Sequence, residues 1–256
     1  MVDVKALVLA AGLGTRLRPL TDTMPKALLA VDGIPVIEHN LLLLREHGIR
    51  EVTINLHAHP QAIPAYLGDG RRWGLHVRYS YEDRLMGTAG ALKRCEQTFR
   101  DAPFVVLYGD NLSDTDITAL RALYDRAGAI GAIALHRPED PSASGIVAVD
   151  AGGRVQSFIE KPRPYDPSMG QWANAGLYIL SPAVLTEIPT ETVCDFGHDV
   201  FPRLLRAGYP LVAAPVCHYL LAIDTPERYA RAQATLAERR AASDADTNAG
   251  PPATSP

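Results

Sequence analysis

Short apolar segments alternate with amphipathic helical segments through the first half of this 256-residue chain. The apolar segments have the length of buried strands, and apolar residues recur every three to four positions in the segments between them. Expected strands are Lys5–Ala10, Glu51–Leu56, His76–Ser80, Pro103–Tyr108 and Ala129–Leu135, and expected helices are Pro35–His47, Pro60–Leu67, Thr88–Thr98 and Asp116–Ala127. This order predicts an α/β fold, with a mostly parallel, Rossmann-like sheet sandwiched by helices.

The pattern changes after Pro138, where turns rather than helices separate the apolar segments. The segments 145–149, 155–159 and 172–180 are expected to form an inserted, more antiparallel β-rich lobe. Helices at 182–187 and 196–207, a strand at 211–214 and a last helix at 226–240 complete one expected domain, residues 1–240. Residues 241–256 are rich in Ala, Ser, Asp and Pro, so we expect them to form a disordered tail.

Charge and cysteine content narrow the classes of function. The 25 Lys and Arg residues against 29 Asp and Glu residues give a net charge of −4, which argues against a nucleic-acid binder with a basic footprint. Cys95, Cys194 and Cys217 are far apart and form neither a disulfide framework nor a CxxC metal site. The chain begins directly with a strand-like segment, and no apolar run is long enough to cross a bilayer. We therefore expect a cytoplasmic protein without nucleic-acid or membrane partners.

A loop with two glycines follows the first expected strand. Gly12 and Gly14 leave backbone N–H groups exposed directly after a buried strand, which suits phosphate oxygens. A Rossmann fingerprint would need a third glycine near Arg16 and an acidic residue after the second strand, where the chain has Asn55-Leu56-His57. A Walker A loop would need Gly-Lys-Ser/Thr, which is absent. The loop is expected to bind phosphate in another way; the alternative is an ordinary strand-to-helix turn.

The segment Gly12–Thr21 (GLGTRLRPLT), followed by Pro25-Lys26-Ala27-Leu28, resembles the signature of sugar-1-phosphate nucleotidyltransferases. The resemblance extends over the chain to about Ala237. In that family the loop wraps a nucleoside triphosphate. The resemblance therefore implies that the nucleotide is bound by Ala10, Ala11, Gly12, Gly14 and Thr15.

The same resemblance implies that Arg16 and Lys26 are catalytic and neutralise the α-phosphate and the leaving pyrophosphate. Lys26 is also one of only four lysines in an arginine-rich chain, which agrees with a specific role for its compact charge. The implied reaction joins a nucleoside triphosphate to a sugar or sugar-like cyclitol 1-phosphate and releases pyrophosphate. The attacking phosphate oxygen is already ionised at pH 7, so the reaction needs positioning and charge stabilisation rather than a general base.

A Mg²⁺ ion held by carboxylates would supply much of that stabilisation. Asp110 ends an apolar strand at the edge of the sheet where α/β proteins bind ligands, and the resemblance assigns the metal to it. The alternative for Asp110 is an ordinary turn aspartate.

The second metal carboxylate departs from the family pattern. The family usually has Asp-Ile-Gly-Thr-Pro before its last helix, whereas this chain has Ala222-Ile223-Asp224-Thr225-Pro226. Residues two apart on a strand face the same side, so Asp224 can be expected to reach the ion from the shifted position. The alternative role for Asp224 is to cap the helix that follows.

The segment 81–90 resembles the base-reading loop of the family. Gly87 and Thr88 are expected to lie at the nucleotide, and Glu82 to accept a hydrogen bond from a guanine edge. The segment looks more like guanylyl-transferring than thymidylyl-transferring members, which favours GTP. The alternative for Glu82 is a solvated loop acid.

Five residues match the sugar-phosphate side of the family: Gly109, Glu160, Lys161, Asn174 and Gly176. Lys161 would pair with the 1-phosphate, Glu160 and Asn174 would bind sugar hydroxyls, and Gly176 would allow close approach of the backbone. The alternative is a surface turn and a strand-end asparagine. The segment 195–199 also resembles a family segment and is expected to help define this pocket.

Three functions stay open at this point. The first is guanylyl transfer to a sugar 1-phosphate, and the second is uridylyl transfer to a hexose or N-acetylamino-sugar 1-phosphate. The third is a non-catalytic regulatory paralogue that binds nucleotide-sugars, which Ala222 motivates. We expect a minimal protein without the C-terminal β-helix of larger relatives, and a homodimer is compatible with the resemblance.

Overall fold

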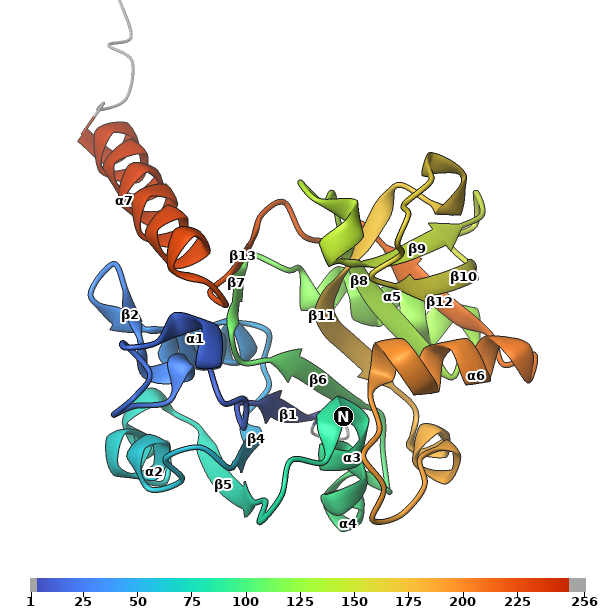
Figure 1. The fold of residues 1–256 in the computed structure, drawn as a ribbon, viewed down its shortest axis with the longest axis horizontal. Helices are drawn as coiled ribbons and strands as arrows, with labels where there is room; N and C mark the ends of the chain where they lie inside the picture. Colours follow the sequence, from blue (N-terminus) through green and yellow to red (C-terminus); the bar gives the residue numbers. More distant parts are fainter. Residues whose placement is uncertain (1–3, 249–256) are drawn as a thin grey trace, which may run out of the picture.

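One mixed sheet of nine strands runs through the computed structural model, which describes residues 4–248, with side chains as far as residue 241 (Figure 1). The strand order is β10-β9-β11-β6-β1-β4-β5, with β8 beside β11 and β12 beside β8. The strands are β1 (Lys5–Leu9), β4 (Glu51–Leu56), β5 (His76–Tyr81), β6 (Phe104–Tyr108), β8 (Gly131–His136), β9 (Gly145–Val149), β10 (Val155–Glu160), β11 (Trp172–Leu180) and β12 (Leu211–Ala214).

Strand direction divides the sheet into two parts. β1 is parallel to β4 and β6, and β4 is parallel to β5, as the strand–helix alternation predicts. β11 is antiparallel to β6, β8 and β9, and β9 is antiparallel to β10, so the expected β-rich lobe extends the same sheet. The predicted α/β class with additional antiparallel strands is therefore confirmed.

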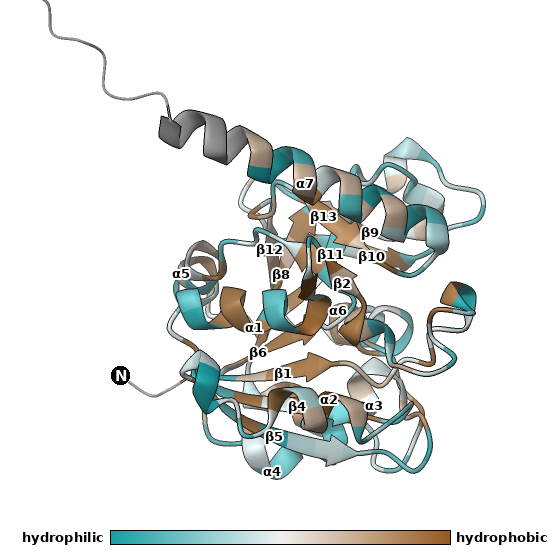
Figure 2. Ribbon diagram, turned by 90° about the vertical axis from the view of Figure 1, so that its left-hand side faces the viewer, coloured by the Kyte–Doolittle hydropathy of each residue, from teal (hydrophilic) through white to brown (hydrophobic). Residues whose placement is uncertain are grey.

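Helices cover both faces of the sheet. They are α1 (Val36–Glu46), α2 (Ala62–Leu67), α3 (Gly87–Arg94), α4 (Glu96–Phe99), α5 (Ile117–Ala127) and α6 (Phe201–Arg206), whereas α7 (Pro226–Asn248) packs outside this sheet, on residues 30–31 and 220–222. Alternate residues of β1 point to opposite faces: Val8 packs in the cluster of α1, α2 and α5, whereas Leu7 packs in the cluster of α3, α4 and α6. Figure 2 accordingly shows apolar strands inside and polar residues on the outer helices. Among residues 4–248, no helix combines the length and apolar composition that a bilayer crossing requires.

Several elements differ from the expectation. The expected helix 88–98 is two helices, α3 and α4, which meet at Cys95, and 182–187 is a 3₁₀-helix. A turn of π-helix at 196–200 precedes α6. The last helix does not end at Arg240 but continues to Asn248. Residues 249–256 of the expected tail lie outside the described residues, and the domain boundary at 240 stays a prediction.

Two short strand pairs were absent from the prediction. β2 (Ala30–Val31) pairs with β3 (Ile34–Pro35), and β7 (Asn111–Ser113) pairs with β13 (Leu220–Ala222). A third apolar cluster joins these strands to α7 through Leu112, Ile223 and Ala232. The start of α7 is thereby fixed beside the end of β6.

The parallel strands end level with one another. Leu9 at the end of β1 is opposite both Asn55 in β4 and Tyr108 in β6. Asn55 is buried, and its Oδ1 accepts a hydrogen bond from the Ala10 amide at 2.7 Å while its Nδ2 donates to Glu82 Oε1 at 2.7 Å. Asn55 thus joins the end of β4 to the residues that follow its neighbours β1 and β5.

We expect Asn55→Ala to lower the free energy of unfolding by about 2 kcal/mol more than Asn40→Ala does. Both asparagines are buried, so both variants lose similar packing, but only the first leaves the Ala10 amide and Oε1 of Glu82 without this partner. Asn40 is a matched control because its Nδ2 has no hydrogen-bond partner among the described residues. Urea unfolding followed by circular dichroism measures both values; equal losses would contradict this role of Asn55.

Candidate active site

A cleft of about 960 Å³ lies between the ends of the parallel strands, the β-rich lobe and α7. It is large enough for a nucleotide-sized ligand. Eight of the residues predicted from the sequence line it: Arg16, Thr88, Asp110, Glu160, Lys161, Asn174, Gly176 and Asp224. The structure thus brings Arg16 and the expected metal and sugar residues to one cavity, whereas Lys26, Glu82, Gly87, Gly109 and residues 10–15 are not among the residues that line it.

The phosphate loop follows β1 and contains two glycines, and a different physical reason favours glycine at each position. Gly14 has φ +64°, and its carbonyl accepts a hydrogen bond from Thr21 Oγ1 at 2.8 Å. Gly14 precedes the 3₁₀ turn Thr15–Leu17, in which Leu17 is buried. At Gly12, a Cβ would lie 3.1 Å from Cε of Lys26, so the missing side chain gives the lysine its path. Ala10 and Ala11 are buried where the loop leaves the sheet.

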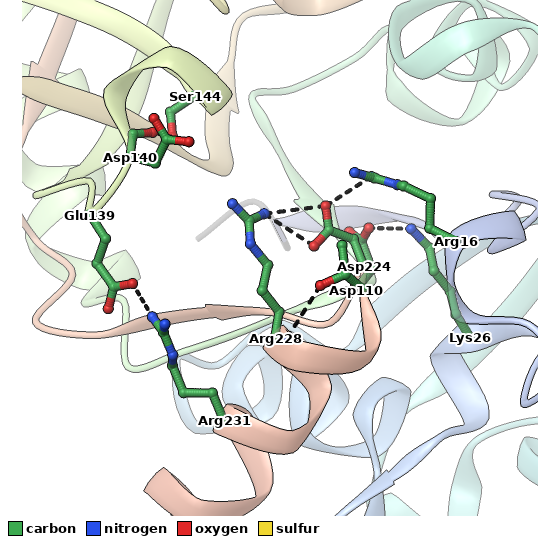
Figure 3. Close-up of polar contacts among 10 residues, drawn as sticks. Arg16, Lys26, Asp110, Glu139, Asp140, Ser144, Asp224, Arg228 and Arg231 are labelled. Atoms are coloured by element: carbon green, nitrogen blue, oxygen red, sulfur yellow. Dashed lines mark hydrogen bonds and ion pairs between the residues drawn. The ribbon is translucent and has the colours of Figure 1, made fainter.

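Lys26 forms an ion pair with Asp110 (Figure 3). Both side chains are largely buried, with exposed fractions of 16% and 21%. Asp110 follows β6, and Gly109 before it donates from its amide to the Leu9 carbonyl at 2.9 Å. A Cβ at Gly109 would lie 2.9 Å from that carbonyl oxygen, so Gly109 packs the end of β6 against β1. The pair joins the phosphate loop to the end of the central strand.

Asp224 is the centre of a second charge cluster. Arg16 Nη2 lies 2.8 Å from Asp224 Oδ2, and Arg228 Nη1 lies 3.1 Å from Oδ1 and 3.3 Å from Oδ2 (Figure 3). The alternative role of Asp224 as a helix cap is wrong, because Thr225 Oγ1 accepts the hydrogen bond from the Arg228 amide at 3.3 Å. The Ile223 amide donates to the Asp110 carbonyl at 3.0 Å, so the backbones that carry the two aspartates are adjacent.

The base-side segment is more buried than expected. Glu82 is 5% exposed, and its second oxygen, Oε2, accepts from the Met86 amide at 3.0 Å, so it is not a solvated loop acid. Gly87 has φ +76°, and a Cβ there would lie 2.5 Å from the Cys194 carbonyl oxygen. Thr88 Oγ1 donates to Asp195 Oδ1 at 3.0 Å and accepts from the Phe196 amide at 2.9 Å. The segment 195–199 is therefore tied to α3, and Asp195 lines the cleft.

Asn174, one of the residues predicted for the sugar side, is positioned by hydrogen bonds within its own strand, β11. Asn174 Nδ2 donates to the Tyr178 hydroxyl at 2.7 Å, and its Oδ1 accepts from the Gly176 amide at 2.8 Å. Burial raises the pKa of Tyr178 well above its usual value and that of neighbouring Tyr108 to about 12, so both hydroxyls stay protonated. The side chain of Lys161 is exposed, and its Nζ lies 3.6 Å from Glu160 Oε1.

The carboxylate of Glu160 occupies space that two glycines leave free. A Cβ at Gly145 would lie 2.6 Å from Glu160 Oε2, and a Cβ at Gly197 would overlap the same oxygen. All three residues line the cleft. The pattern Asp195–Asp199 in the sequence indicates the segment that carries Gly197, but not this contact.

Sequence patterns did not indicate Asn111 and Arg228, which line the cleft, or Asn55 and Tyr178, which bond to predicted site residues. Asn111 Nδ2 donates to the Ala175 carbonyl at 3.2 Å, which links β7 to β11. Only Arg228 carried a visible signal, because it follows Asp224 by four residues at the start of a helix, the spacing of a helical ion pair.

The chain matches a family model described as nucleotidyl transferase over residues 5–237. It is 37% identical over 223 residues to a UTP–glucose-1-phosphate uridylyltransferase of Synechocystis sp., which covers 82% of this chain and 57% of that protein. It is 35% identical over 235 residues to a mannose-1-phosphate guanylyltransferase of Mycobacterium tuberculosis, which covers 91% of this chain and 65% of that protein. The chain thus spans about three fifths of the length of these curated relatives.

Solved structures show a similar fold. A Bacillus anthracis protein described as a candidate glucose-1-phosphate thymidylyltransferase, in complex with sucrose, superposes with a TM-score of 0.82 at 25% identity. The superposition covers 91% of this chain and 94% of that one. HddC from Yersinia pseudotuberculosis, complexed with GMP-PN, superposes with a TM-score of 0.74 at 23% identity over 91% of this chain and 99% of the other. At 23% identity, the similarity to HddC shows a common fold and nothing more.

Gly176→Ala should destabilise the protein more than Gly48→Ala does. Both glycines have positive φ, +72° and +77°, so both variants bear the cost of a left-handed alanine, about 1 kcal/mol. A Cβ at Gly176 would also lie 2.8 Å from Asn111 Nδ2 and 2.9 Å from Cγ of Tyr108, whereas no atom lies within 4 Å of one at Gly48. Overpacking should add about 1–3 kcal/mol at Gly176, measured by urea unfolding. Equal losses would show that the sugar side has room for the methyl group.

Proposed function

This chain belongs to the nucleotidyl transferase family, and on that premise we propose that it transfers a nucleoside monophosphate from a nucleoside triphosphate to a sugar 1-phosphate. One observation carries the proposal: a single cleft joins Arg16 of the phosphate loop and Asp110, the partner of Lys26, to the polar side chains of the β-rich lobe. In the proposed reaction, an oxygen of the sugar phosphate forms a bond to the α-phosphorus. The bond from the α-phosphorus to the oxygen that bridges it to the β-phosphate breaks, and pyrophosphate leaves with the electron pair.

Charge compensation is the main task that this reaction sets. Two anions must approach one another, and negative charge builds up on the leaving pyrophosphate. We assign Lys26 and Arg16 to the α-phosphate and the pyrophosphate, and backbone amides from Ala10 to Thr15 to the triphosphate. Lys26 is held by Asp110, and Arg16 is held by Asp224, so both cations already point toward the strand ends where the reaction is proposed.

Two carboxylates suit a divalent cation. Among the residues with described side chains, no three His, Cys, Asp or Glu groups gather as a complete metal site. Mg²⁺ instead is commonly held by one or two carboxylates together with substrate phosphates, and Asp110 and Asp224 on adjacent backbones fit that mode. The arginines on Asp224 agree with it, because ligating carboxylates are themselves hydrogen-bonded. When bound, such a cation would neutralise phosphate charge and polarise the α-phosphate.

Glu160, Lys161, Asn174 and Gly176 are assigned to the sugar 1-phosphate. Asn174 retains one amide hydrogen and one lone pair after its bonds to Tyr178 and Gly176, which suits a sugar hydroxyl. Glu160 can accept from a second hydroxyl in the space that two glycines leave. Gly109 supports this side by packing rather than by contact, since it holds the end of β6 against β1.

We assign GTP as the nucleotide, with Glu82, Gly87 and Thr88 at the base side. Support comes from the guanylyltransferase among the relatives and from the acid at position 82. Each oxygen of Glu82 accepts one protein hydrogen bond, and a carboxylate oxygen has a second lone pair that a guanine edge could use. Uridylyl transfer is the second candidate, because the 37% identical relative is named a uridylyltransferase.

Lys26→Ala and Asp110→Ala should each slow product formation by about 100-fold or more, since the first removes a cation that stabilises the transition state and the second removes the carboxylate that holds this cation and would hold the metal. Pyrophosphate release measures the rate. Lys5→Ala and Asp125→Ala are matched controls, because Lys5 bonds the Thr98 carbonyl and Asp125 pairs with Arg121. Wild-type rates in the Lys26 or Asp110 variant would contradict the mechanism.

A substrate panel tests the reaction itself. GTP, UTP, ATP and dTTP are each mixed with Mg²⁺ and with mannose 1-phosphate or glucose 1-phosphate, and pyrophosphate release is followed. We expect the fastest release with GTP. Fastest release with UTP would replace guanylyl by uridylyl transfer, and no release with any pair, alongside tight binding of a nucleotide-sugar, would favour a non-catalytic binding protein.

A further inference from the structure

Arg228 is a cation of the cleft to which the mechanism above assigns no contact with a substrate. It lines the cleft with a side chain that is 40% exposed, and it shares the Asp224 carboxylate with Arg16. Two guanidinium groups on one carboxylate leave the cluster with a net charge of about +1, because arginine stays protonated. One positive charge in this part of the cleft therefore lacks a counterion within the cluster.

The place of Arg228 in α7 is electrostatically unfavourable. Thr225 caps the helix, which puts Arg228 in the first turn, where the helix macrodipole disfavours a cation. Asp224 offsets only part of this cost, since it also pairs with Arg16. A phosphate group in the cleft would complete the charge balance at this position.

Arg228 points toward the β-rich lobe. In Figure 3 its guanidinium extends from α7 into the space between Asp224 and the segment of Asp140 and Ser144. Hydrogen bonds from Ser142 hold the pKa of Asp140 below its usual value, and the charge of Arg228 adds to this lowering. Asp140 and Ser144 line the same cleft as Lys161, and the Lys161 amide donates to the Ser144 carbonyl at 3.1 Å, so Arg228 extends toward the segment that is bonded to this lysine.

We propose that Arg228 binds the phosphate group of the sugar 1-phosphate. This assignment rests on the proposed function. A sugar phosphate brings close to two negative charges, whereas Lys161, the cation assigned to it from the sequence, is exposed and lies 3.6 Å from Glu160. The planar guanidinium fork of Arg228 can bind two phosphate oxygens at once, and the two contacts to Asp224 fix its orientation.

Titration calorimetry of the full chain with mannose 1-phosphate and glucose 1-phosphate tests the assignment. Arg228→Gln should weaken binding of the sugar phosphate that the wild type prefers by about tenfold or more, because a charge-assisted hydrogen bond is lost, and should leave GTP binding unchanged. Arg228→Lys keeps the positive charge but lacks the planar guanidinium fork, so its affinity for the sugar phosphate should lie between those of the wild type and of Arg228→Gln. Arg239→Gln is the matched control on the same helix, since Arg239 stacks on Tyr219 at 4.3 Å, and it should bind like the wild type.

The outcomes separate this assignment from the proposed function. Unchanged sugar-phosphate binding in Arg228→Gln, or an equal loss of GTP binding, would overturn the assignment of Arg228. Turnover by the wild-type protein would in that case still uphold the proposed function. Binding that depends on Arg228 in a wild type without turnover would support the assignment and overturn the function. A wild type that binds neither sugar phosphate would overturn both.

Discussion

The ion pair between Lys26 and Asp110 holds the phosphate loop against the end of β6. A charge that is mostly buried is costly without a partner, so each side chain fixes the other beside the cleft that Asp110 lines. The contact needs space, which the missing side chain at Gly12 provides for the lysine. It also needs β1 and β6 to end level, which their parallel register ensures. The geometry of the phosphate side therefore follows from one contact between distant parts of the chain.

The charge balance of the site explains why a divalent cation is part of the proposal. Lys26, Arg16 and Arg228 carry three positive charges against the two carboxylates Asp110 and Asp224, which leaves about one positive charge. A nucleoside triphosphate and a sugar phosphate together bring several negative charges into this space. Protein side chains alone do not match them, and a metal ion shared with the phosphates is the usual remedy.

Local patterns predicted the strands and the phosphate loop, because burial and turn chemistry are encoded in neighbouring residues. The place of Asp110 at the strand ends could be predicted because it directly follows an apolar strand. The sequence did not reveal the pairing of β7 with β13, whose residues are more than a hundred positions apart. That pairing brings Asp224 to Asp110 and leaves the helix cap to Thr225. Nor could periodicity reveal that Glu82 is buried, because its partner Asn55 lies on another strand.

The proposed transfer between two bound phosphates requires that both substrates be held in fixed relative positions, and partly buried hydrogen bonds around the cleft suit this need. Thr88 on the base side bonds to Asp195 and Phe196, which precede the helix of the β-rich lobe. Behind the sugar side, the fully buried Tyr178 holds Asn174, and its strand β11 pairs directly with β6, which ends beside Asp110. Because one continuous sheet carries both sides, a shift of the sugar residues relative to Asp110 would have to break strand pairing. In the proposed reaction, the antiparallel β11 would thus couple the residues assigned to the sugar to those assigned to the reacting phosphates.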